Sequence, residues 1–202
     1  MSIDLSINSA QTSEKITRFI QETMRKTGLT KLVIGLSGGI DSAVSCALAT
    51  RAIGSENIHA GIFPYGQLNK EGVEDAQLVA DFLKIPRVNR HLIDIQPCVD
   101  PIINSSSDAM AGESGSLRKG NIMVRTRMIL LFDLSKNEKA LVLGTENKTE
   151  HLLGYFTRCG DEASDIEPIR NLYKTQVREL ASYLGIPKKI IEKTPTAGMW
   201  AG

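Results

Sequence analysis

Residues 31–42 read Lys-Leu-Val-Ile-Gly-Leu-Ser-Gly-Gly-Ile-Asp-Ser, and this stretch decides the fold. The apolar run from Leu32 to Leu36 predicts a buried strand, since short continuous apolar runs are typical of strands covered on both faces. Ser37-Gly38-Gly39 then forms a turn, and apolar residues with helical spacing follow from Asp41. The free N–H groups at the start of that helix point toward the glycine turn and favour a bound anion such as phosphate.

The aspartate inside this predicted anion site, Asp41, has two interpretations. A carboxylate beside phosphates is repulsive unless a cation lies between them, which points to Mg²⁺. Alternatively, the Asp41 side chain caps the helix by accepting hydrogen bonds from its first N–H groups. The loop contains neither Gly-x-x-x-x-Gly-Lys-Ser/Thr nor Gly-x-Gly-x-x-Gly. It therefore differs from the common NTPase loop and from the dinucleotide-binding loop.

The composition is that of one soluble globular domain. The 202 residues are 42% hydrophobic and 23% charged, and they suffice for a single core. A net charge of +1 gives no reason to expect binding to nucleic acid or to a membrane surface. No apolar run reaches the roughly 20 residues that span a bilayer, and the N-terminus does not resemble a signal peptide. Cys46, Cys98 and Cys159 are far apart, which favours a reducing compartment, and we expect a cytoplasmic protein.

The order of the predicted elements favours a parallel sheet. Strands and helices alternate in the first half of the chain, which predicts an α/β fold: a doubly wound, mostly parallel sheet with helices on both faces. The predicted strands cover 32–36, 57–63, 87–93 and 140–144. The predicted helices cover 12–27 (capped by Thr12 or Ser13 and ended by Gly28), 41–54, 70–84, 120–137 and 173–184.

The segment 118–132 is apolar nearly all round, which predicts a helix buried on more than one side, with a second subunit as one partner for it. Arg125 and Arg127 lie within it, and a buried guanidinium is costly unless an anion pairs with it. Arg118, Asn121 and Arg125 share one helical face. We interpret that face as reaching a phosphate or carboxylate of a ligand, and a structural ion pair with a buried acid is the alternative.

The segment from Gly144 to Glu150 reads Gly-Thr-Glu-Asn-Lys-Thr-Glu and follows the last predicted strand. Ligands of parallel sheets bind at the carboxyl ends of strands, so Thr145 is placed to contact a nucleotide and Glu150 to be a second carboxylate for Mg²⁺. The alternative for Glu150 is a first-turn acid that pairs with an Asn147 cap. Lys174 shares a helical face with apolar residues, so its ammonium points inward and needs a negative partner such as the phosphates of ATP.

Two further features have weaker interpretations. Residues 160–165 form an acidic loop of small residues, which either holds ribose or amide groups or is a solvated turn. His59, His91 and His151 are scattered along the chain, and we interpret them as structural or surface residues rather than ligands.

Several of these segments together resemble one family. The loop from Gly35 to Ser42 is similar to the pyrophosphatase loop of the PP-loop ATP enzymes, which split ATP into AMP and pyrophosphate. With four further segments in the family's order, the chain resembles ammonia-dependent NAD⁺ synthetases from about residue 31 to 198. Those segments are Lys119-Gly-Asn-Ile-Met-Val-Arg-Thr-Arg127, Gly144-Thr-Glu-Asn-Lys-Thr-Glu150, Gly154-Tyr-Phe-Thr-Arg-Cys-Gly-Asp161 and Lys193-Thr-Pro-Thr-Ala-Gly198.

The resemblance implies a ligase that amidates deamido-NAD⁺ to NAD⁺ with ammonia through an NAD-adenylate, releasing AMP and pyrophosphate. It implies Mg²⁺ as cofactor, and a homodimer with deamido-NAD⁺ sites at the subunit interface. By position it assigns to ATP the residues Gly35, Leu36, Ser37, Gly38, Gly39, Ile40, Asp41, Ser42, Thr145, Lys174 and Thr196. It assigns Asp41 and Glu150 to the metal, and Arg125, Arg158, Asp161 and Asp165 to deamido-NAD⁺. The catalytic candidates are Asp41, Glu150 and Lys174.

Residues 1–202 are expected to be a single PP-loop synthetase domain, without the acidic loop, helix and basic tail that follow this region in the family. Two other functions remain open. Another PP-loop enzyme would adenylate a tRNA base or a nucleotide, although a net charge of +1 and 5% aromatic residues argue against tRNA. A non-catalytic nucleotide-binding subunit would not need the paired metal carboxylates that the chain retains at Asp41 and Glu150.

Overall fold

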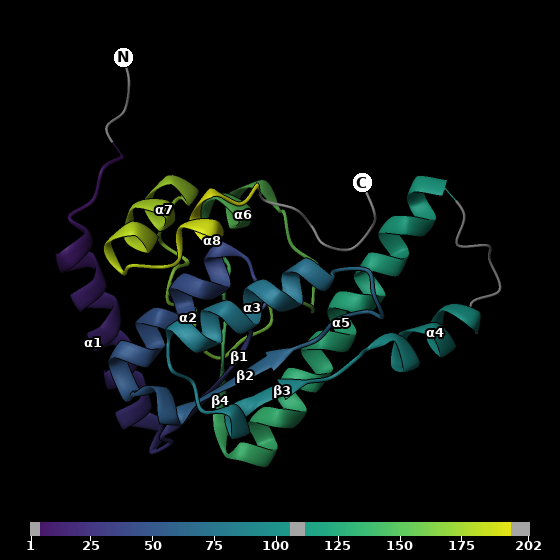
Figure 1. Cartoon of the computed structure of the whole chain (residues 1–202), viewed down its shortest axis with the longest axis horizontal. Helices are drawn as coiled ribbons and strands as arrows, with labels where there is room; N and C mark the ends of the chain where they lie inside the picture. The colour runs from purple at the N-terminus through teal and green to yellow at the C-terminus, as the bar shows by residue number, and fades with distance from the viewer. Residues whose placement is uncertain (1–4, 106–111, 195–202) are drawn as a thin grey trace.

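The computed structural model describes residues 5–105 and 112–194, and the strands within them form one parallel sheet (Figure 1). The order across the sheet is β3-β2-β1-β4. β1 (Lys31–Gly35) lies between β2 (Ile58–Ile62) and β4 (Ala140–Leu143), and β3 (Arg90–Leu92) pairs with the other side of β2. Every pairing is parallel, which confirms the predicted class of fold.

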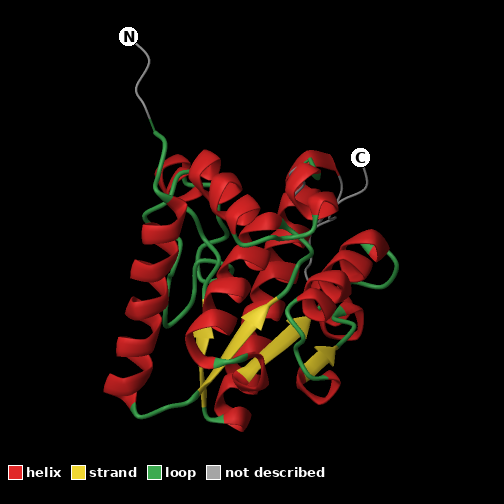
Figure 2. Cartoon of the chain, turned by 60° about the vertical axis from the view of Figure 1, so that its left-hand side comes forward, coloured by secondary structure: helices red, strands yellow, loops and turns green. Residues whose placement is uncertain are grey.

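Helices cover both faces of this sheet (Figure 2). They are α1 (Ser9–Thr27), α2 (Ile40–Ile53), α3 (Lys70–Phe82), α4 (Gln96–Asn104), α5 (Gly112–Glu138), α6 (Lys148–Leu153), α7 (Lys174–Tyr183) and α8 (Lys188–Glu192). Leu32 and Ile34 of β1 belong to the larger apolar core, which includes residues of α2, α3 and α7. Gly35, on the alternate side of β1, faces Leu131 of α5. None of the helices in the described part of the chain has the length and apolar character that crossing a membrane requires.

The strand order reverses direction at β1. The chain leaves β1 through α2 to β2, continues through α3 to β3, and returns through α4 and α5 to β4 on the other side of β1. The segments that follow β1 and β4 therefore diverge. Open parallel sheets bind their ligands at such a switch point, outside the carboxyl ends of the strands.

The first helix begins earlier than predicted because Asn8 caps it. The Asn8 side chain accepts a hydrogen bond from the Gln11 N–H at 3.0 Å, so neither Thr12 nor Ser13 is the cap. Gly28 ends the helix in a left-handed conformation, as predicted.

The predicted strand at 87–93 is shorter in the structure. Arg87–Asn89 forms a 3₁₀ turn, and only Arg90–Leu92 pairs with β2. His59 of β2 and His91 of β3 are neighbours in space, with Nδ1 and Nε2 3.3 Å apart, although they are distant in the sequence. Both lie outside the cavity described below, which agrees with a structural role.

α5 is confirmed as a helix, but burial on more than one side is not. It packs against β1, β4 and α4. Its buried stripe includes Met123 and Val124, whereas Ile129 is 58% exposed. The sheet covers only one side of a helix laid against it, and among the described residues the side of α5 that carries Ile129 remains open.

Gly38 allows α3 to contact the loop that follows β1. Its φ of +78° lies in the left-handed region, which other residues adopt only at a cost. A Cβ atom at Gly38 would lie 2.5 Å from the Gly72 carbonyl oxygen and 2.8 Å from Asp75 Cβ. The close contact between loop and helix therefore requires glycine at this position.

Gly38→Ala is expected to destabilise the protein by about 3 kcal/mol or more, because a steric clash adds to roughly 1–2 kcal/mol of left-handed strain. Gly28→Ala is the matched control, since Gly28 has a φ of +72° but no atom within 4 Å of an added Cβ. The control should lose only about 1–2 kcal/mol. Equal losses for the two variants in urea unfolding would contradict this account of Gly38.

Candidate active site

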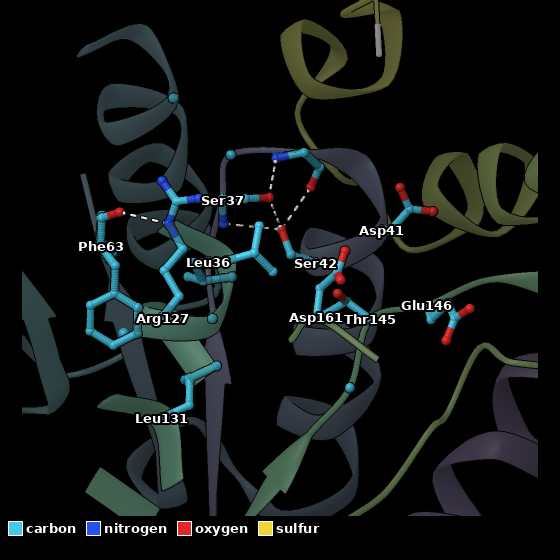
Figure 3. Close-up of a pocket in the computed structure, with 18 of the residues that line it drawn as sticks. Leu36, Ser37, Asp41, Ser42, Phe63, Arg127, Leu131, Thr145, Glu146 and Asp161 are labelled. Atoms are coloured by element: carbon cyan, nitrogen blue, oxygen red, sulfur yellow. Dashed lines mark hydrogen bonds between the residues drawn. The ribbon is translucent and has the colours of Figure 1, made fainter. Parts of the chain in front are cut away.

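A cavity of about 480 Å³ opens at the carboxyl ends of β1 and β4 (Figure 3). Its wall comprises the loop after β1, the end of β2, one side of α5 and the segment after β4. The whole predicted loop from Gly35 to Ser42 lines the cavity, together with Thr145, Glu150 and Lys174. The structure therefore brings these candidates from distant parts of the sequence into one site.

Two serines hold the loop after β1. Ser42 Oγ accepts a hydrogen bond from the Ser37 N–H at 3.4 Å and donates to the Gly39 carbonyl oxygen at 3.0 Å. The Gly39 N–H donates to Ser37 Oγ at 3.2 Å. Gly39 is the N-cap residue of α2, so the capping interpretation of Asp41 is wrong, and Asp41 lies in the first turn instead. A glycine cap has no side chain to occupy the first N–H groups of α2, which leaves them suited to an anion.

Asp41, Glu150 and Lys174 meet where α2, α6 and α7 begin. The Lys174 ammonium forms ion pairs with the Asp41 carboxylate and, at 3.3 Å, with Glu150 Oε1. Asn147 Nδ2 donates a further hydrogen bond to Asp41 Oδ1 at 2.9 Å. Burial raises the pKa of Glu150, and the nearby Asp41 carboxylate raises it further. The single ammonium therefore balances only part of the negative charge gathered here.

Glu150 also completes the start of α6. Asn147 Oδ1 accepts from the Glu150 N–H at 3.1 Å, and Glu150 Oε2 accepts from the Asn147 N–H at 3.3 Å. These reciprocal bonds form a capping box, so the structural interpretation of Glu150 is confirmed. The other carboxylate oxygen, Oε1, takes no part in capping and contacts Lys174, so Glu150 can cap α6 and also act in the cavity.

The two carboxylates fit a magnesium ion that also contacts a nucleotide. Such an ion is usually held by one or two carboxylates, and phosphate oxygens and waters complete its six ligands. Asp41 and Glu150 supply that number. Within residues 5–105 and 112–194, no group of three or more His, Cys, Asp or Glu side chains is placed to hold a metal by itself.

The inward-facing guanidinium expected on α5 belongs to Arg127, which is partly buried, rather than to Arg125. Arg127 lines the cavity, and its Nε donates to the Phe63 carbonyl oxygen at 3.0 Å (Figure 3). Burial lowers the pKa of Arg127, and the Asp161 carboxylate opposes this shift. Arg125 is exposed, and its Nε donates to the Arg158 carbonyl oxygen at 3.1 Å. Residues two apart on a helix are rotated by about 200° and so point to nearly opposite sides, which means that the packing of α5 decides which arginine turns inward.

Of the other residues predicted to contact deamido-NAD⁺, one lines the cavity and two lie outside it. Asp161 lines the cavity, and its Oδ1 accepts a hydrogen bond from a backbone N–H at 2.7 Å. Arg158 is exposed, and Asp165 Oδ2 accepts from the Val142 N–H at 2.8 Å; neither residue lines the cavity. Thr196 lies outside the described residues.

A buried acidic cluster beside the cavity is not evident from the sequence. Glu146, whose side chain is 4% exposed, lines the cavity and accepts from Arg170 Nη1 at 2.6 Å. Arg170 Nη2 lies 2.9 Å from His151 Nδ1. Burial raises the pKa of nearby Glu167 to about 7, although Ser164 Oγ donates to its carboxylate at 2.6 Å. The contacts of Arg170 join it to Glu146 and His151, 24 and 19 positions earlier in the chain, so no local pattern indicates them.

Glu167→Gln is expected to flatten the pH dependence of stability between about pH 4.5 and 7. The pKa of Glu167 is higher in the folded state than its ordinary 4.5, so the folded state holds this proton while the unfolded state releases it. The wild type should therefore lose on the order of 1–3 kcal/mol of unfolding free energy across this window, and the amide should lack that loss. Urea unfolding at a series of pH values measures the difference, and parallel curves would contradict it.

Comparison with known proteins identifies the family. The family model for NAD synthase matches residues 12–202. An NH₃-dependent NAD⁺ synthetase from Chlorobium phaeovibrioides is 47% identical over 199 residues, which cover 98% of this chain and 69% of that protein. One from Thermococcus kodakarensis is 46% identical over 189 residues, which cover 94% of this chain and 71% of that protein.

Solved structures agree with this comparison. The NH₃-dependent NAD synthetase of Campylobacter jejuni, at 37% identity, superposes with a TM-score of 0.85 over 93% of this chain and 78% of that one. The NMN synthetase of Francisella tularensis, at 34% identity, gives a TM-score of 0.88 over 98% of this chain and 79% of that one. Because the family model and these relatives match nearly all of its length, the chain belongs to the NAD synthase family.

Proposed function

We propose that this chain is a ligase that amidates deamido-NAD⁺ to NAD⁺ with ammonia and ATP, through an NAD-adenylate, releasing AMP and pyrophosphate. Its relatives named NH₃-dependent NAD⁺ synthetase support this assignment. The observation that carries it is the meeting of Asp41, Glu150 and Lys174 at the start of α2, inside the cavity. Two carboxylates and an ammonium beside a helix N-terminus suit a metal-bound triphosphate.

We assign ATP to the loop Gly35–Ser42 and to Thr145, Lys174 and Thr196, and Mg²⁺ to Asp41 and Glu150. The N–H groups at the start of α2 would hold phosphate oxygens, and the Lys174 ammonium would contact them from the side of α7. Mg²⁺, when bound, neutralises phosphate charge and orients the triphosphate.

The substrates themselves supply the reacting groups. The nicotinate carboxylate attacks the α-phosphorus of ATP and pyrophosphate leaves, which gives a mixed anhydride with AMP. Ammonia then adds to the activated carbonyl carbon, AMP leaves, and the nitrogen loses a proton. No side-chain nucleophile is required, so the protein places the substrates and stabilises the negative charge that gathers on the departing pyrophosphate.

We assign deamido-NAD⁺ to Asp161 inside the cavity and to Arg125, Arg158 and Asp165 outside it. Arg125 and Arg158 are both exposed, and a hydrogen bond from the Arg125 side chain to the Arg158 backbone keeps them together. Arg127 is a further cation for the part of the ligand inside the cavity.

The purified chain, given ATP, Mg²⁺, deamido-NAD⁺ and ammonium, is expected to form NAD⁺ and AMP in equal amounts, as measured by chromatography. A parallel reaction offers nicotinate mononucleotide instead, because one structural neighbour is named NMN synthetase. Faster turnover of the mononucleotide would overturn the assignment of deamido-NAD⁺. Absence of an amidated product in both reactions would overturn the proposed function.

Glu150→Gln tests the proposed metal role in this assay. The amide can still complete the capping box with Asn147, so the fold should persist. Loss of the carboxylate should lower turnover roughly 100-fold or more and raise the Mg²⁺ concentration needed for half-maximal rate. Glu22→Gln, at an exposed position of α1, should change neither quantity. An unchanged Mg²⁺ requirement in Glu150→Gln would argue against the metal role.

We also propose that residues 1–202 form one synthetase domain that pairs as a homodimer through the open side of α5. Ile129 of this helix is 58% exposed and belongs to neither apolar core of the described residues, so a second subunit packed on it would remove apolar surface from water. Sedimentation equilibrium should give twice the mass of one chain, and Ile129→Glu should shift the protein toward monomer. Val88→Glu, at a position 85% exposed, should not. A wild-type monomer at micromolar concentration would contradict the proposal.

A further inference from the structure

Asp75 of α3 is a buried carboxylate held by two lysines from the far end of the described chain. It is fully buried, and Lys189 Nζ of α8 lies 2.7 Å from its Oδ1. Lys193 Nζ, directly after α8, lies 2.5 Å from its Oδ2. A buried carboxylate requires such partners, because an unpaired charge in the interior costs several kcal/mol.

This ion-paired cluster lies directly behind the loop proposed to bind ATP. Asp75 Cβ would be only 2.8 Å from a Cβ at Gly38, so α3 packs directly against the loop at this point. Lys193 lines the same cavity as the loop, and its side chain is 22% exposed. Lys189 is 52% exposed and does not line the cavity. The two lysines share one carboxylate, but only Lys193 faces the site.

The Asp75 carboxylate neutralises only one of the two lysines that contact it, so positive charge remains beside the cavity. One buried carboxylate faces two ammonium groups. Two other acids lie nearby. Glu71 lies 3.9 Å from Lys193 and 4.0 Å from Lys189, and its side chain is 64% exposed. Glu74, which interacts with Lys189, is also exposed. Water screens the charges of exposed acids, so Glu71 and Glu74 neutralise little of the positive charge of the two ammonium groups. An anion in the cavity beside the loop would balance it.

We propose that Lys193 is a further phosphate-binding residue, which contacts the leaving pyrophosphate part of a bound nucleoside triphosphate, and that Asp75 is its positioning residue. Lys174 approaches the loop from the side of Asp41, and Lys193 approaches it from the side of Asp75. The two ammonium groups would hold the triphosphate from two directions. This inference rests on the proposed function for the identity of the ligand as ATP, whereas the binding of pyrophosphate can be tested without turnover.

The test is calorimetric titration of the purified chain with inorganic pyrophosphate and Mg²⁺. Lys193→Met should weaken pyrophosphate binding about 10- to 100-fold, the usual range for one hydrogen bond to a charged group. Lys189→Met is the matched control, because it also removes one of the two lysines paired with Asp75 and so causes the same structural disturbance. The affinity of this variant for pyrophosphate should stay within about threefold of wild type. Lys193→Arg, which keeps the charge, should recover most of the affinity.

Asp75→Asn tests the positioning role. It should weaken pyrophosphate binding less than Lys193→Met does, and adding it to Lys193→Met should cause no further loss, since both act through one ammonium group. Equal losses in Lys193→Met and Lys189→Met, or wild-type affinity in Lys193→Met, would overturn the inference. If the chain binds pyrophosphate as expected but forms no NAD⁺, the proposed function is overturned, whereas the role of Lys193 in binding pyrophosphate is supported.

Discussion

One ammonium group shared by two carboxylates determines the arrangement of the site. Lys174 begins α7, whereas Asp41 and Glu150 lie in the first turns of α2 and α6, so these ion pairs join three helix starts. Like charges brought together in a partly buried place repel each other unless a cation lies between them. Lys174 therefore holds together the segments that follow β1 and β4, which are the strands between which the sheet order reverses.

The same charges constrain how a nucleotide can enter. Two carboxylates and one ammonium leave one negative charge, which repels a free triphosphate and attracts a divalent cation. In our proposal the nucleotide and Mg²⁺ thus bind together on the side of Asp41. The phosphates themselves require a positive environment. In our proposal the N–H groups of α2, Arg127 of α5 and Lys193 after α8 supply it. In this proposal the site therefore has one side for the metal and other sides for the phosphates.

Local patterns in the sequence predict the four strands, the longer helices and the loop, but they miss the shorter helices α4, α6 and α8 and do not predict contacts between distant segments. The strand, turn and helix over 31–54 follow from residue order alone, and they form as expected. The choice between Arg125 and Arg127 depends on how α5 is rotated against β1 and β4, which the apolar pattern of a nearly all-apolar helix does not fix. The pairing of Asp75 with Lys193 spans 118 positions and has no local signal at either residue.

α5 connects the two halves of the proposed substrate surface. Its Asn121 Oδ1 accepts a hydrogen bond from Thr157 Oγ1 at 2.9 Å, and Arg125 donates to the Arg158 backbone, so the loop that carries Asp161 is fixed to the helix. The open side of the same helix is the surface proposed for a second subunit. A partner packed there would restrain α5 and, through these two bonds, the position of the loop. The geometry offered to the dinucleotide would then depend on dimer formation, because one rigid helix carries both contacts.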